Sequence, residues 1–172
     1  MRGGIRRGPL AAFALLTVAV VAGFVLRRAL APRIPGIEIV DLRGEVRFIT
    51  LREIRSHDGI ERRGSYQNQF GNWGGDAVYS GVRLRDLLPE GPEGVAVIAA
   101  DGYEVRFTIE QVSDDAYPVA LVLCVDGICM PDLDEGFRIA VLPEDGGVSN
   151  QEYGVDSAGS YWVRDVVRLQ LE

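Results

Sequence analysis

The chain has 172 residues, 18 basic and 25 acidic, with one histidine, two cysteines and a formal net charge of -7. Every basic residue is an arginine, so chemistry that needs a lysine, such as Schiff-base formation, is excluded. One histidine cannot build a site with several histidine ligands, and two cysteines cannot build a four-thiolate zinc site or an iron–sulfur cluster. The acidic balance argues against nucleic acid as a partner.

The charge divides the chain into two parts. Six arginines and no acidic residue lie in the first 33 residues, and the remaining chain carries 12 arginines against 25 acids, a net charge of -13. The sequence therefore predicts a basic, apolar leader followed by an acidic folded domain.

Residues 9–26 form an uncharged apolar run with arginines on both sides. At about 1.5 Å of rise per residue, a helix of this length spans nearly the whole hydrocarbon core of a bilayer. We therefore expect a basic flank at residues 1–8, a transmembrane anchor at 9–26, a linker at 27–36 and a domain at 37–172. A cleaved signal peptide is the alternative, with a poor cleavage context at residues 29–31.

Orientation depends on the arginines beside the apolar run, and both flanks are positive. We expect a single-pass membrane protein with a cytoplasmic N-terminus and an extracytoplasmic domain. Its partners would be the membrane, through residues 9–26, and a membrane or surface protein.

The domain has the pattern of many short strands separated by short capped helices. Strands are expected at 37–40 and 46–49, followed by a helix that begins in the capping box 50–53. The same order returns at 104–107, where a strand precedes a second capping box at 108–111.

The remaining elements are read from apolar blocks and helix-breaking residues. We expect a helix at 82–88 that ends before Pro89, buried strands at 95–100 and 119–125, and further strands at 137–142 and 162–171. Short helices among many strands predict an α+β fold with mixed β-sheets.

Asp126-Gly127 between two apolar runs predicts a two-residue β-hairpin. In that register Cys124 lies opposite Cys129, with their Cα atoms about 4.5 Å apart. A disulfide is sterically feasible at that distance and is favoured outside the cytoplasm. Two small apolar residues on one face, or a redox-active pair, are the alternatives.

Five segments, taken in order, carry a resemblance to a known family: 79–88, 101–103, 125–131, 137–143 and 161–169. They are similar to segments of the molybdopterin-binding domain of the sulfite oxidase family. The resemblance implies a sulfite oxidase-type α+β fold with mixed β-sheets and short helices, here preceded by one transmembrane helix. It also implies an oxidoreductase-like protein with a molybdopterin cofactor.

In that family one cysteine thiolate holds the molybdenum, ahead of a Gly-Asn pair. The matching stretch at 65–73 contains no cysteine, and the ligand position falls on Asn68 or Gln69. Neither amide replaces a soft thiolate. The lysine of the family's closing segment is replaced by Tyr161. The positions that keep the family's residues are Gly71, Asn72 and Arg138.

The stretch 65–75 is polar, aromatic and rich in glycine. It is either a pocket-forming loop with amide donors and a stacking face, or an ordinary turn with a packed tryptophan. No catalytic residue and no metal ligand is assigned. The resemblance implies these candidate cofactor-binding residues: Asn68, Gln69, Gly71, Asn72, Trp73, Tyr103 and Arg138.

Two functions follow as hypotheses. The first is a membrane-anchored, molybdopterin-binding, oxidoreductase-like domain without standard molybdenum ligation. It would be either an oxidoreductase or a catalytically inactive binder of a pterin or another small molecule. The alternative is a non-catalytic extracytoplasmic module that binds a ligand or a protein on the same scaffold. Convergence of Asn68, Asn72 and Arg138 on one open cleft favours the first, and a loop collapsed over Trp73 favours the second.

Overall fold

Two β-sheets make up the part of the chain that the computed structural model describes, residues 35–172. The predicted membrane anchor at 9–26 lies outside the described residues. The described part is one compact unit from Pro35 to Glu172. Among its helices, none has the length and apolar character needed to cross a bilayer.

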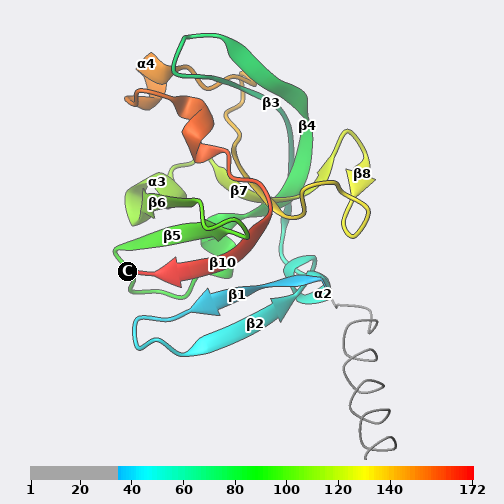
Figure 1. The fold of residues 1–172 in the computed structure, drawn as a ribbon, viewed down its shortest axis with the longest axis vertical. Helices are drawn as coiled ribbons and strands as arrows, with labels where there is room; N and C mark the ends of the chain where they lie inside the picture. Colours follow the sequence, from blue (N-terminus) through cyan, green and yellow to red (C-terminus); the bar gives the residue numbers. More distant parts are fainter. Residues whose placement is uncertain (1–34) are drawn as a thin grey trace, which may run out of the picture. The chain divides into compact units, whose positions relative to one another are not determined.

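The first sheet has the strand order β2-β1-β10-β5-β6 (Figure 1). Its strands are β1 (Gly36–Val40), β2 (Val46–Thr50), β5 (Gly94–Ala99), β6 (Glu104–Thr108) and β10 (Val166–Leu171). Strand β1 runs parallel to β10, and the other neighbours are antiparallel. The expectation of a mixed sheet is therefore confirmed.

The second sheet has the order β3-β4-β7-β8, with β9 also paired to β7. Its strands are β3 (Gly59–Gln67), β4 (Trp73–Arg83), β7 (Val119–Val125), β8 (Ile128–Cys129) and β9 (Arg138–Val141). The β3–β4 hairpin arches over the rest of the domain (Figure 1). The predicted register of the β7–β8 hairpin is confirmed, because Val125 pairs with Ile128 and Cys124 with Cys129.

The helices are one turn each. They are α2 (Leu51–Ile54), η1 (Leu84–Leu87), α3 (Ile109–Ser113), α4 (Asn150–Tyr153) and η2 (Ala158–Tyr161), where η marks a 3-10 helix. The expected α+β character, with mixed sheets and few short helices, is confirmed.

The two predicted capping boxes form to different extents. At α3 the Thr108 side chain accepts from the Gln111 backbone N–H, and the Gln111 side chain accepts from the Thr108 backbone N–H. At α2 the Thr50 side chain accepts from the Glu53 N–H, but the Glu53 carboxylate bonds Arg47 instead of completing the box.

Two predicted element boundaries are wrong, the first because strand pairing overrides the local pattern. Val82 and Arg83 belong to β4, where they pair with Leu121 and Ala120, and only Leu84–Leu87 turns as a helix. The final strand starts at Val166 instead of residue 162, because Asp165 has a φ of 51° and this left-handed conformation interrupts an extended chain.

The expected loop at 65–75 is also corrected. Strands β3 and β4 continue into it, with Tyr66 paired to Gly74 and Gln67 paired to Trp73, so only 68–72 remains as a turn. The pairing of the two long strands continues through this stretch, although its residues are polar and rich in glycine.

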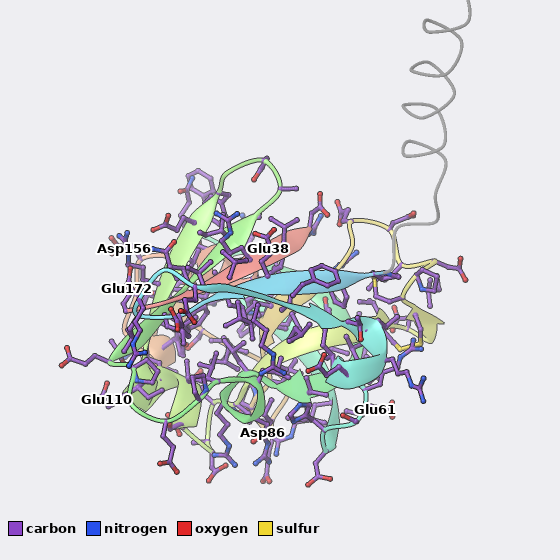
Figure 2. The ribbon with its side chains drawn as sticks, turned by 90° about the horizontal axis from the view of Figure 1, so that it is seen from below. Glu38, Glu61, Asp86, Glu110, Asp156 and Glu172 are labelled. Carbon is purple, nitrogen blue, oxygen red and sulfur yellow. A yellow bond between two sulfur atoms is a disulfide. The ribbon has the colours of Figure 1, made fainter. Side chains whose placement is uncertain are left out.

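The core lies between the two sheets. Side chains from both sheets are almost fully buried in one cluster, among them Leu169 on β10, Val97 on β5, Leu121 on β7 and Ile139 on β9. Each such side chain stabilises the fold by about 2 kcal/mol relative to its exposure. The outer face of the first sheet carries ion pairs instead, among them Arg168 with Glu38 at 2.6 Å; Glu38 is labelled in Figure 2.

Candidate functional site

The tip of the β3–β4 hairpin is built around Asn68. Its side-chain Oδ1 accepts hydrogen bonds from the backbone N–H of Phe70 at 2.9 Å and of Asn72 at 3.0 Å. Gly71 has a φ of 78°, a left-handed conformation that glycine adopts without strain. The Asn68 amide oxygen therefore closes the turn and is already engaged within it.

Asn150, at the start of α4, ties the tip to the rest of the domain. Its Nδ2 donates to the Asn68 carbonyl at 2.9 Å, and its Oδ1 accepts from the Ala158 N–H at 2.8 Å. Its own N–H donates to Gln67 Oε1 at 3.0 Å. Sequence reasoning missed this residue, although Ser149, whose side chain caps α4 by accepting from the Glu152 N–H, offered a signal.

Trp73 begins β4 and is 55% exposed. Its ring lies against Gly147, where an added Cβ would come within 3.0 Å of the indole. A cavity of about 440 Å³ lies beside it, and its lining includes Arg63, Asp76 and Asp145. Glycine at 147 therefore lets the following loop pack directly on the tryptophan.

The arginine of this cavity is already neutralised. Arg63 donates to Asp76 through Nε at 2.7 Å and through Nη2 at 2.8 Å. This hydrogen bond holds the pKa of the Asp76 carboxyl below its ordinary value. An anionic ligand would have to compete with Asp76 for the guanidinium.

Arg138 lies at the start of β9. Its Nη2 donates to the Asp134 carbonyl at 2.9 Å and forms an ion pair with Glu135 at 3.2 Å. Its buried Nε, like the buried indole Nε1 of Trp162, has no hydrogen-bond partner among residues 35–172. Both side chains line a cavity of about 10 Å³, which has the size of one water molecule.

Aromatic rings fill the space around that cavity. The Trp162 ring lies 4.9 Å from Tyr66 and 4.9 Å from Tyr79, measured between centroids. A pterin does not fit in the remaining volume. The cavity beside Trp73 and the cavity beside Arg138 share no lining residue.

Tyr103 lies in the turn between β5 and β6 and is 46% exposed. Its hydroxyl donates to the Ser160 carbonyl at 3.0 Å, so it holds η2 against this turn. The structure therefore brings five of the seven candidate residues together at one hairpin tip, and places Tyr103 and Arg138 in other contacts. The five are Asn68, Gln69, Gly71, Asn72 and Trp73.

Both cysteines of the chain form one disulfide. Cys124 and Cys129 are joined across the β7–β8 hairpin with an S–S distance of 2.03 Å. No thiolate remains to hold a metal, so the family's molybdenum ligation does not fit this chain. Within residues 35–172 no group of three or more histidine, cysteine or acidic side chains is placed to hold a metal ion.

No family model matches the chain, and the comparison with curated proteins found no match. Among solved structures, the sulfane dehydrogenase SoxCD from Paracoccus pantotrophus is similar, with a TM-score of 0.57 and 16% identity. The match covers 80% of this chain and 38% of that chain, so this chain spans less than half of its neighbour's length. At this identity the similarity shows a distant relationship of fold alone.

Proposed function

We propose that this domain is a non-catalytic ligand-binding module on a scaffold of the sulfite oxidase type. The observation that carries the proposal is the state of the two cysteines, which form one disulfide on β7–β8. The position that resembles the family's ligand falls instead on Asn68 or Gln69. A molybdenum centre held by a protein thiolate therefore has no ligand in this chain.

The hairpin tip supports the same function. The side-chain amide oxygen of Asn68 accepts from two backbone N–H groups of the turn, and its backbone carbonyl accepts from the Asn150 side chain. Side chains engaged in local hydrogen bonds stabilise a shape and leave fewer groups for a reaction. The remaining exposed surface of the tip, with Phe70 77% and Trp73 55% exposed, suits contact with a ligand or a protein.

Molybdopterin binding without thiolate ligation is the second candidate. The resemblance over residues 65–172 and the fold similarity to the sulfane dehydrogenase favour it. Such a pterin would be held by Asn72 and by arginines, outside the filled space beside Arg138. It would make the protein an oxidoreductase-like carrier of the cofactor.

We further propose that residues 9–26 anchor the protein in a membrane and that the domain lies outside the cytoplasm. The Cys124–Cys129 disulfide supports this location, because such bonds persist in oxidising compartments. Protease accessibility of the domain in intact and in lysed spheroplasts tests it. Protection in intact spheroplasts would contradict the extracytoplasmic location.

The cofactor content decides between the two functions. The full chain is expressed in a host that makes the molybdenum cofactor, and molybdenum, tungsten and oxidised-pterin fluorescence are measured on the same purified sample. We expect neither metal nor pterin in a folded protein. Pterin without metal would support the second candidate, and near-stoichiometric metal and pterin would overturn the non-catalytic function.

A further inference from the structure

Another cavity lies at the β2 edge of the first sheet, and none of its lining residues belongs to the β3–β4 hairpin. Its volume is about 470 Å³, within the range of small-molecule sites. It is bounded by the β1–β2 ribbon, by α2 and by the segment 86–89 that ends η1. Figure 2 shows Asp86 of this segment below the β1–β2 ribbon.

The register of β1 and β2 explains why the sheet opens here. Residues directly opposite in an antiparallel pair lie on the same face. Ile37 pairs with Ile49, and both are buried on the inner face. Ile39 pairs with Arg47, so the next inner position of the edge strand carries an exposed arginine instead of an apolar residue. The core layer ends at this pair and the cavity begins.

The floor of the cavity is apolar. Ile39, Ile49, Ile54 and Leu171 are buried beneath it, and Leu88 stands half-buried at its side. An aliphatic group bound on this floor would bury its apolar surface away from water. Each buried methylene would tighten binding by about fourfold.

The rim of the cavity is acidic. It carries four carboxylates, against one arginine and the single histidine; the carboxylates are Asp41, Glu45, Glu53 and Asp86. Two of them are engaged: Glu53 bonds Arg47, and Asp41 Oδ1 accepts from the backbone N–H of Arg43 and of Glu45.

The other two carboxylates are available to a ligand. Glu45 forms no ion pair with any residue of 35–172. Asp86 has Arg85 at 3.7 Å, but that guanidinium lies nearer to Asp115, at 2.9 Å. Glu45 and Asp86 thus line a cavity with an apolar floor, which is the arrangement that recognises a cation attached to an aliphatic group.

We propose that this cavity binds a small organic cation with an aliphatic chain, of the alkylammonium class. The proposal rests on the non-catalytic binding function above and names its ligand class. The ammonium group lies between Glu45 and Asp86, and the chain lies on the floor formed by Ile39 and Ile54. An anion of the same length is repelled by the rim.

Hexyltrimethylammonium is the probe, and hexanesulfonate, which has the same chain and the opposite charge, is its control. Residues 35–172 contain the whole described core and form one compact unit, so this segment is used with ¹⁵N labelling and the result is repeated on the full chain. We expect the cation to shift the amide signals of Leu88 and Ile54 and to bind more weakly at high salt. The sulfonate leaves these signals in place.

The matched variants remove two charges each. Glu45→Gln with Asp86→Asn is expected to weaken binding by about fivefold or more. Asp132→Asn with Asp156→Asn removes the same charge from exposed positions outside the cavity, and Asp156 lies at a different edge of the domain from Asp86 (Figure 2). This control is expected to change the affinity by less than about twofold. All four positions are exposed, so folding is retained.

Three outcomes would overturn the proposal: no shifts with the cation, equal shifts with the sulfonate, or equal weakening in both double variants. Metal and pterin content, measured on the same sample, reports separately on the function on which the proposal rests. A sample without metal or pterin that does not bind the cation overturns the ligand class alone. A sample loaded with both overturns the binding-module function itself.

Discussion

Asn150 and Asn68 join two distant parts of the chain, since the Asn150 side-chain amide donates to the Asn68 carbonyl at 2.9 Å. The same amide accepts from the N–H of the fully buried Ala158. One side chain thus connects the hairpin tip, α4 and η2. The shape of the tip depends on this residue as well as on the turn itself.

Asn150→Ala is expected to lower the free energy of unfolding by about 2 to 3 kcal/mol, because two hydrogen bonds are lost and a buried N–H is left unpaired. Urea denaturation measures the change. Gln151→Ala, in the next position of the same helix, is the control and is expected to stay within about 0.5 kcal/mol. Equal effects of the two substitutions would contradict the role assigned to Asn150.

The disulfide closes a short loop, since Cys124 and Cys129 are five positions apart. Loop entropy predicts that Cys124→Ala with Cys129→Ala lowers the free energy of unfolding by about 2 kcal/mol. When the unsubstituted protein is unfolded without a reducing agent, thiol titration should find no free thiol. A reactive thiol in the unreduced sample would show that the bridge is not formed.

Gly81 has no room for a side chain. An added Cβ would lie 2.1 Å from the Leu121 carbonyl oxygen on the neighbouring strand β7, at the point where the register of the pair shifts. Gly81→Ala is expected to cost about 3 kcal/mol in thermal or urea unfolding, because two backbones must move apart.

Gly59→Ala is the matched control. Gly59 lies on β3 opposite Val82 of β4, and an added Cβ would meet only the Gly81 carbonyl oxygen, at 3.8 Å. We expect a change of less than about 0.5 kcal/mol there. If Gly81→Ala lowered the free energy of unfolding no more than the control does, the result would contradict the close approach of β4 and β7.

Tyr153 buries a hydroxyl for which residues 35–172 supply no hydrogen-bond partner. Burial, with a smaller contribution from Tyr161, raises the pKa of this hydroxyl well above its ordinary value. The unfolded chain releases this proton near pH 10 and the folded chain does not. The stability that Tyr153 contributes is therefore present below about pH 10 and is lost as the pH rises above it.

Tyr153→Phe removes the hydroxyl and keeps the ring contacts with Tyr117 and Tyr161. At about pH 8 we expect no loss of stability, because no described hydrogen bond is broken. At about pH 11 the variant should be the more stable protein. Chemical denaturation at the two pH values measures this, and an unchanged difference between them would contradict the buried state of the hydroxyl.

Local patterns in the sequence predicted much of the domain. The Asp126-Gly127 turn set the register that pairs Cys124 with Cys129, and Thr108 with Gln111 predicted a complete capping box. These features depend on residues close in the chain, whose hydrogen bonds form wherever the segment lies. The mixed α+β character followed from the same short-range periodicities.

Only the tertiary structure decided where distant segments meet. Glu38 and Arg168 are 130 positions apart and form an ion pair across the parallel strands β1 and β10. Pairing with β7 turned Val82 from an expected helix into a strand, and the Ile39–Arg47 pair opened the acidic cavity. Such contacts depend on which surfaces the folded chain can bury together, and no local period encodes that choice.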